Sequence, residues 1–204
     1  MNNYNGRKLY GRGYIGNGKY RSKIDGKETI YYSYWHSIFR RCYSESALKR
    51  NATYKDCFAN EEIYCLQDFG EWFDNNYYEI EREKMCLDKD ILVKGNKEYS
   101  FDKMIFVPEH INTLFIKNNK NRGKYPIGVC YYKRYNKYMA YCNIIEDNCQ
   151  KKKYLGYYET PEEAFLAYKQ FKEQYIKQVA DEYKGRVPDR LYEAMYKWEV
   201  EIDD

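Results

Sequence analysis

The sequence predicts an α+β protein in which a mixed first half precedes a small antiparallel sheet packed on one long helix. Three observations lead to this prediction. Apolar residues recur at helical spacing in two segments of the first half, residues 31–43 and 62–80. Three short strand-like segments follow residue 126. A capped and strongly periodic helical segment then occupies residues 161–183.

The first 80 residues predict two helices behind a polar arm. Residues 1–30 are rich in Gly, Asn and Lys, which favours an arm or short hairpin with no core of its own. A helix is expected over residues 31–43, and a polar loop over residues 45–62. A second, amphipathic helix is expected within residues 62–80. Its apolar stripe consists of Ile63, Leu66, Phe69, Trp72 and Phe73.

Residues 85–117 predict a strand, a loop, a second strand and a helix, in that order. The first strand lies in MCLDKDIL and ends at two aspartates that flank a lysine. The loop is KGNKEYS, and the second strand, KMIFVP, is stopped by Pro108. EHINTLFIK follows as a helix with Ile111, Leu114 and Phe115 facing inward.

The second half predicts a separate domain. Residues 118–125 have the composition of a linker, and residues 126–204 follow as one unit. Its strands are IGVCYYKRY, KYMAYCNII and KKKYLGYY. Thr160, Pro161 and Glu163 are typical of a helix start with a capping box. A further helix is expected to end near Trp198, before an acidic tail.

Charge and tyrosine content point to a polyanion as ligand. The net charge is +4, but residues 113–157 hold ten Lys or Arg against two acidic residues. Residues 158–204 hold seven basic against twelve acidic residues. A basic segment of this kind favours a local polyanion-binding surface. The 27 Tyr could stack on bases or touch phosphates, although AT-rich codons would also explain their number.

Cysteine usage favours a reduced, cytoplasmic protein with free thiols. The seven Cys are odd in number and form no CxxC pair. No apolar run approaches the length that spans a membrane, so no membrane partner is expected. A zinc site is conceivable, but its spacing fits no common pattern, and no zinc is expected. Its ligands would be His36, Cys42, Cys57 and Cys65.

Several segments, taken in their order and spacing, resemble a phage protein family. Members couple an HNH-type (ββα-metal) domain to a DNA-binding domain similar to the plant APETALA/ethylene-response type, which is also found on integrases and homing endonucleases. The resemblance implies an HNH-like domain over residues 31–117 and an integrase-type domain over residues 126–204. The segments that carry it are YWHSIFRRCYS, TYKDCF, DFGEWF, LDKDIL, GNKEYS, IFVPEHIN, IGVCYYKRYNKYMAYC and YLGYYETPEEAFLAYKQFK.

The resemblance implies a metal-dependent active site with one departure. In HNH nucleases the first strand ends in Asp-His; the His deprotonates a water and the Asp helps hold Mg²⁺. An Asn in the loop orients that His, and a His or Asn on the helix completes the metal site. By resemblance, Asp88 and Asn112 would hold Mg²⁺ and Asn96 lies in the loop. Lys89 stands where the general-base His is expected, so the site is degenerate.

Lys89 and His110 each leave alternatives open. An ammonium with a pKa of about 10.4 does not act as a base at neutral pH. The flanking aspartates would further favour its charged form. Lys89 would then close a salt-bridged turn or bind a phosphate as a point charge. His110 is the one His near the site in the sequence. It could serve as a displaced base or a metal ligand, or it could be an ordinary surface residue of the helix.

In the integrase-type fold the resemblance places a three-stranded sheet on the DNA major groove, with the helix on its back. The strand period of two puts Tyr138, Ala140, Cys142 and Ile144 on the helix side. The plant members use several Arg and Trp on the DNA side, where this chain has mostly Tyr, so bidentate reading of guanine is not expected beyond Arg134. The residues expected to face DNA are Tyr132, Arg134, Tyr141, Asn143, Lys152 and Tyr154.

Two functions follow from these patterns. The first is a phage or prophage protein that binds double-stranded DNA on a degenerate HNH scaffold. It would act as a regulator or as an inhibitor of host defence, such as an anti-CRISPR, with a host nucleoprotein complex as a further partner. The alternative is an active, Mg²⁺-dependent homing-type endonuclease. The acidic tail could shield the basic face or mimic nucleic acid toward a partner.

Overall fold

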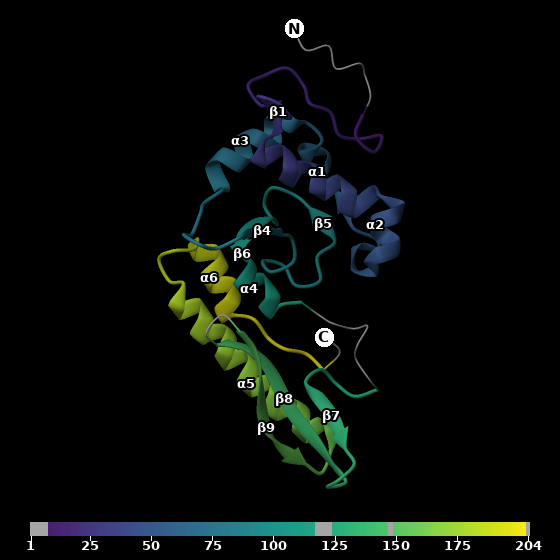
Figure 1. Cartoon of the computed structure of the whole chain (residues 1–204), viewed down its shortest axis with the longest axis vertical. Helices are drawn as coiled ribbons and strands as arrows, with labels where there is room; N and C mark the ends of the chain where they lie inside the picture. Colours follow the sequence, from purple (N-terminus) through teal and green to yellow (C-terminus); the bar gives the residue numbers. More distant parts are fainter. Residues whose placement is uncertain (1–7, 117–123, 147–148, 203–204) are drawn as a thin grey trace. The chain divides into compact units, whose positions relative to one another are not determined.

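The chain folds into two compact α+β units, one formed by Met1–Asn112 and the other by Thr113–Asp204 (Figure 1). This computed structural model describes residues 8–116, 124–146 and 149–202. The predicted α+β class is therefore confirmed. Of the predicted linker at 118–125, residues 118–123 lie outside the described part of the chain.

The core of the first unit is built by α1 (Ile30–Tyr43) and α3 (Leu66–Asn76). The predicted apolar stripe of the second helix is largely correct, because Leu66, Phe69 and Phe73 are buried in α3. Ile63 is also buried, although it belongs to the preceding 3-10 turn η2 (Glu61–Ile63). The Trp35 indole donates a 2.7 Å hydrogen bond to the main-chain oxygen of Ile63 and so joins α1 to this turn.

Residues 45–62, expected to be a loop, contain regular structure instead. α2 (Glu45–Arg50) begins at Ser44, whose hydroxyl accepts a hydrogen bond from the Ala47 main-chain nitrogen. The 3-10 turn η1 (Ala52–Tyr54) and the strand β3 (Phe58–Ala59) follow. The polar composition hid these elements because α2 buries no residue and so carries no apolar stripe.

The N-terminal segment is more than an arm without a core. Its predicted hairpin exists as β1 (Lys23–Ile24) and β2 (Lys27–Glu28). Tyr20 is only 5% exposed and packs into the main core of the first unit. The Gln67 side chain accepts from the Tyr20 main-chain nitrogen at 3.0 Å and donates to its main-chain oxygen at 2.9 Å. These bonds fasten the segment to α3.

The predicted strand–loop–strand–helix order is present in the first unit. β4 (Met85–Asp88) pairs antiparallel with β6 (Ile105–Pro108), and α4 (Glu109–Leu114) follows directly. All four residues of β6 are buried, which explains why its sequence is a continuous apolar run. Within the connecting loop, β5 (Glu98–Tyr99) pairs in parallel with β3.

The second unit is a three-stranded antiparallel sheet in the order β7-β8-β9, covered on one face by α5 (Figure 1). Its strands are β7 (Val129–Tyr132), β8 (Lys137–Glu146) and β9 (Cys149–Tyr158). The two helices are α5 (Pro161–Glu182) and α6 (Asp189–Tyr196). α5 begins with the predicted capping box. Over the described residues, no helix combines the length and apolar character that crossing a membrane requires.

Candidate functional site

The sheet of the second unit presents one face to α5 and the other to solvent. Ala140 and Cys142 of β8 are buried in a cluster with Ala164, Phe165 and Tyr168 of α5. Tyr138 and Ile144 pack against the same cluster, so the predicted helix-facing side of β8 is confirmed. We refer to the opposite side of the sheet as the outer face. It carries Cys130, Tyr132, Lys137, Met139, Tyr141, Asn143, Lys152, Tyr154 and Tyr157.

A lysine and a tyrosine meet at the centre of the outer face. Tyr141 is paired across the strands with Tyr154, and Asn143 is paired with Lys152. The Lys152 ammonium lies over the Tyr141 ring, 4.3 Å from its centroid. Tyr154 is 63% exposed. A cation, an amide and two aromatic rings therefore occupy neighbouring positions that solvent can reach.

A bulge in β9 adds Tyr157 to the outer face. Ala140 is paired with Gly156 but Tyr141 is paired with Tyr154, so Leu155 is left over and the alternation shifts by one. Gly156 adopts a φ of +135°, a conformation that glycine tolerates far better than other residues. Simple alternation from Tyr154 would have turned Tyr157 toward α5, and for this reason the sequence prediction missed it.

Tyr157 belongs to a cluster of three aromatic rings on and beside the outer face. Its ring centroid lies 5.3 Å from that of Tyr132 and 5.1 Å from that of Tyr135. The Tyr132 and Tyr135 centroids are 5.2 Å apart. Partial desolvation by this packing, together with the neighbouring Tyr132 and Tyr135 hydroxyls, raises the pKa of Tyr157. The Tyr157 hydroxyl therefore remains a protonated donor at neutral pH.

Arg134 lies elsewhere than expected. β7 ends at Tyr132, and Arg134 is an exposed residue of the turn that joins β7 to β8. Strand alternation was wrong for this position because Asn136, with a φ of +55°, closes the turn directly before β8. The Arg134 guanidinium lies 5.7 Å from the centroid of the Tyr135 ring. It thus extends the aromatic cluster at one end of the sheet.

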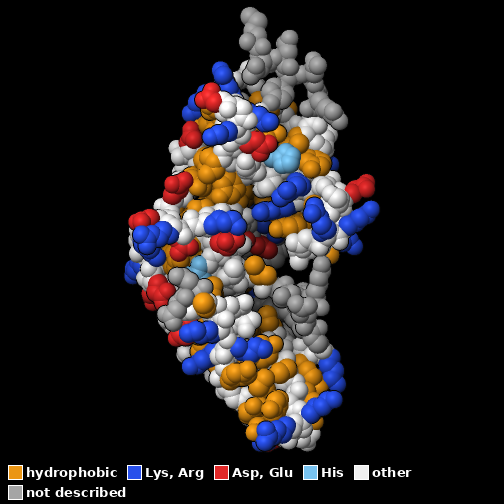
Figure 2. Space-filling view, viewed as in Figure 1, with side chains coloured by type: hydrophobic (Ala, Val, Ile, Leu, Met, Phe, Trp, Pro, Cys, Tyr) orange, Lys and Arg blue, Asp and Glu red, His pale blue; other side chains and the backbone are white. Residues whose placement is uncertain are grey.

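Cations border the aromatic residues of the sheet, and some of them are paired. Lys137 forms an ion pair of 2.7 Å with Glu159, and Lys151 forms one of 2.8 Å with Glu146. Both are surface pairs, which contribute little to stability. Figure 2 shows hydrophobic side chains, a class that includes Tyr, gathered over the sheet with Lys and Arg side chains beside them.

In the first unit, Asp88 ends β4 and holds the following turn. One of its carboxylate oxygens accepts hydrogen bonds of 2.8 Å from the main-chain nitrogens of both Asp90 and Ile91. Burial, followed by the negative charge of Asp90, raises the pKa of Asp88 to about 6. The carboxylate has a structural task of the kind that Asp performs in turns.

Lys89 is buried and bonded inside the same turn. Only 6% of the residue is exposed. Its ammonium donates hydrogen bonds of 3.2 Å to the Asp90 carboxylate and 2.7 Å to the main-chain oxygen of Asn96. The structure thus contains the salt-bridged turn that was one of the alternatives for this residue. Because the side chain is buried and its donors are directed at these acceptors, it cannot easily reach a water or a phosphate.

Asn96 closes the loop from the other side. Its amide nitrogen donates to the main-chain oxygens of Lys89 and Glu98, at 2.7 and 2.6 Å. Its amide oxygen accepts from the main-chain nitrogen of Glu98 at 3.0 Å. Both ends of the side chain are therefore used to brace the loop rather than to orient another side chain.

His110 and Asn112, the other predicted site residues, lie on α4 and are partly buried. α4 is joined to the start of β4, because Lys84 and Glu109 form an ion pair of 2.7 Å there. Asp88 is at the opposite end of β4, where it is paired with Ile105. Over residues 8–116, 124–146 and 149–202, no group of three or more His, Cys, Asp or Glu side chains is arranged to hold a metal ion.

Cys42 and Cys57, two of the ligands considered for zinc, are instead buried in the core of the first unit. Burial raises the pKa of both thiols, so they remain protonated at neutral pH. Each packs there as a small apolar side chain.

Comparison with known proteins adds no relative to this picture. The chain matches no known protein family, no curated protein and no solved structure.

Proposed function

We propose that the chain is a phage or prophage protein that binds double-stranded DNA through the outer face of the β7-β8-β9 sheet. In this proposal the first unit is a non-catalytic scaffold of HNH type. The proposal is supported by the side chains of the outer face and by the bonding of Lys89.

The observation that carries the proposal is the contact between Lys152 and Tyr141, with Asn143 directly opposite Lys152. A lysine over a tyrosine ring is held close to the sheet surface, and its ammonium keeps donors for a ligand because the ring uses only one side of it. Phosphate oxygens are the natural acceptors for such a group. Asn143 adds an amide that can bond to base edges or sugar oxygens in a groove.

The aromatic cluster supports the same ligand. Three neighbouring rings, those of Tyr132, Tyr135 and Tyr157, offer both apolar ring surface and polar hydroxyls. Such rings pack against sugars and donate to phosphates. Among the described residues of the three strands and the β7–β8 turn, Arg134 alone offers a guanidinium, and it lies in the turn. We therefore expect phosphate contacts to dominate over base reading. Affinity should then fall steeply as salt rises.

The first unit favours a role without cleavage. A general base must lie within hydrogen-bond reach of the water that it activates, whereas Lys89 is buried and donates to the Asp90 carboxylate and to a main-chain carbonyl. A phage protein that binds DNA without cutting it would act as a regulator or as an inhibitor of host defence, such as an anti-CRISPR. If the protein inhibits host defence, its partner would be a host nucleoprotein complex.

The test is binding of a fluorescein-labelled DNA duplex, followed by anisotropy over a series of salt concentrations. We expect a linear fall of log K with log salt concentration, and weaker binding by the Asn143→Ala, Lys152→Ala double variant. The Gln174→Ala, Lys177→Ala double variant is the matched control, since both residues are exposed on α5. Equal losses in both variants, or binding that does not respond to salt, would reject DNA as the ligand and leave a protein partner.

A further inference from the structure

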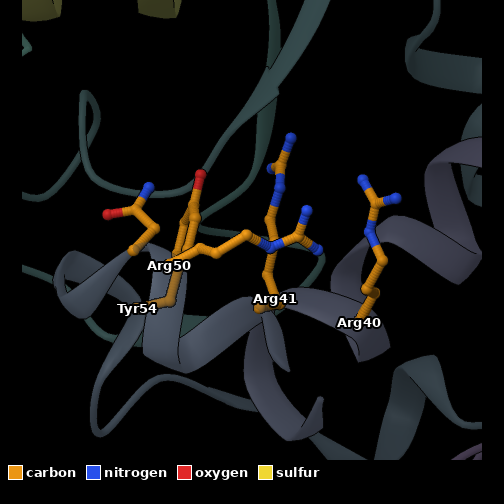
Figure 3. Close-up of a pocket in the computed structure, with 6 residues that line it drawn as sticks. Arg40, Arg41, Arg50 and Tyr54 are labelled. Atoms are coloured by element: carbon orange, nitrogen blue, oxygen red, sulfur yellow. The ribbon is translucent and has the colours of Figure 1, made fainter. Parts of the chain in front are cut away.

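Three arginines line a pocket in the first unit (Figure 3). Arg40 and Arg41 come from the last turn of α1, and Arg50 comes from the last turn of α2. Tyr54 of η1 forms part of the wall, and Figure 3 shows its ring beside the side chains of Arg41 and Arg50. The pocket has a volume of about 380 Å³. It is lined by Arg40, Arg41, Ala47, Arg50, Asn51 and Tyr54.

The lining carries three positive charges and no carboxylate. Guanidinium groups keep their charge at every pH that a folded protein experiences. Like charges gathered in one cavity repel each other, and an anion in the cavity removes that repulsion. The electrostatics of the pocket therefore favour a negatively charged ligand.

Arg41 is held in place before any ligand arrives. One of its terminal nitrogens donates to the main-chain oxygen of Leu87 at 3.2 Å and to the Tyr99 hydroxyl at 3.4 Å. Its guanidinium lies 5.5 Å from the centroid of the Tyr54 ring. Burial alone would lower the pKa of Arg41, but the hydroxyls of Tyr99 and Tyr54 outweigh it and the pKa is raised. A donor fixed in this way loses little entropy on binding.

We propose that this pocket binds the phosphate of a nucleotide unit, either free or within a nucleic-acid strand. A phosphate offers more acceptor oxygens than a carboxylate and can accept from several guanidiniums at once. The volume is in the range of small-ligand sites, which leaves room for a sugar or base beside the phosphate. The Tyr54 ring and the Asn51 amide are the side chains suited to that part of the ligand.

The pocket adjoins the end of β4. Leu87, whose carbonyl holds Arg41, directly precedes Asp88 and the buried Lys89. A strand bound by the arginines would thus lie beside the HNH-like loop, within the first unit. This inference does not depend on DNA binding by the sheet, because every residue that it uses belongs to the first unit.

The experiment is a titration of the full-length protein followed by NMR, with the side-chain Nε–Hε signals of the arginines as reporters. The probes are inorganic phosphate, deoxyadenosine monophosphate, deoxyadenosine, a single-stranded tetranucleotide and a hexaglutamate peptide. We expect the phosphate-bearing probes to shift the signals of Arg40, Arg41 and Arg50, and deoxyadenosine to leave them unchanged. Tighter binding of the tetranucleotide than of the monophosphate would assign a strand as the ligand, and the reverse order a free nucleotide.

The variant for this test is Arg40→Gln, Arg50→Gln, which removes two exposed guanidiniums and leaves the anchored Arg41. We expect its affinity for deoxyadenosine monophosphate to fall by about tenfold or more. The Arg21→Gln, Arg82→Gln double variant removes the same charge from exposed sites of the same unit and should bind normally.

Three results would overturn the proposal. The first is that none of the probes shifts the Nε–Hε signals of the three arginines. The second is that the hexaglutamate peptide binds as tightly as the nucleotides do. The third is deoxyadenosine monophosphate binding no more tightly than inorganic phosphate, which would exclude the nucleotide. Repeating the titration with the Asn143→Ala, Lys152→Ala protein separates this site from the sheet, since loss of sheet binding should leave the arginine shifts intact.

Discussion

Lys89 and Asn96 hold each other through reciprocal hydrogen bonds. The Lys89 ammonium donates to the main-chain oxygen of Asn96, and the Asn96 amide donates to the main-chain oxygen of Lys89, each at 2.7 Å. The two bonds close the loop between β4 and β5. At the position where the resemblance to HNH nucleases would place a general base, this chain has a lysine that is bonded within the loop.

We therefore expect Lys89→Met to destabilise the first unit by about 1–3 kcal/mol. Methionine fills a similar volume, but the partly buried main-chain oxygen of Asn96 loses its hydrogen-bond donor. Urea unfolding followed by circular dichroism measures the change. Lys55→Met, at an exposed position, is the control and should change stability by less than about 0.5 kcal/mol. Equal stabilities for the two variants would show that the reciprocal bonds contribute nothing.

The same bonding predicts that purified protein does not nick supercoiled plasmid with Mg²⁺ or Mn²⁺. The Lys89 amino group donates to the Asp90 carboxylate and the Asn96 main-chain oxygen, so it is not placed to activate a water, and one Asp88 oxygen already accepts two main-chain hydrogen bonds. Agarose gels of plasmid over a time course test this, with Asp88→Ala as the control for contaminating nuclease. Nicking by the wild type that disappears in Asp88→Ala would favour the alternative, an active metal-dependent endonuclease.

The sequence predicted those parts of the fold that depend on local pattern. Helical spacing located α1 and α5, and strand alternation assigned the two faces of β8 correctly. The turn at Arg134 and the bulge at Gly156 escaped prediction, because both depend on backbone conformations that alternation does not contain. The sequence pattern also did not predict the burial of Lys89, since the main-chain oxygen that accepts its hydrogen bond is seven residues away.

The bulge leads to a third prediction, that Gly156→Ala weakens both stability and DNA binding. A Cβ at a φ of +135° is strained, and it would lie 3.2 Å from the Tyr158 hydroxyl. We expect the free energy of unfolding, measured with urea, to fall by about 1–3 kcal/mol. Binding should also weaken, because Tyr157 owes its place on the outer face to the bulge.

The control for this variant is Gly185→Ala. Gly185 also has a positive φ, of +74°, but a Cβ there meets open space. The free energy of unfolding of Gly185→Ala should fall by about 1 kcal/mol, and this variant should bind the duplex normally. If Gly156→Ala binds as well as Gly185→Ala does, Tyr157 is not part of the DNA interface. Tyr157→Ala provides the same test without backbone strain.

A fourth prediction concerns Lys172 of α5, which is partly buried near Cys142. Burial lowers the pKa of Lys172 from its ordinary value of 10.5, although the Cys142 thiol acts in the opposite direction. The unfolded chain therefore holds this proton more firmly than the folded chain does. At neutral pH the charged lysine costs stability, and the cost diminishes as pH rises toward 10.5.

We expect Lys172→Met to raise the free energy of unfolding at pH 7 by about 1 kcal/mol or more, since a buried charge is replaced by an apolar side chain of similar length. The gap between variant and wild type should narrow as the pH is raised toward 10. Urea unfolding at pH 7, 8.5 and 10 measures both effects, with Lys177→Met on the exposed side of α5 as the control. A variant less stable than the wild type at pH 7, or a gap that does not change with pH, would show that the Lys172 ammonium is well solvated in the folded protein.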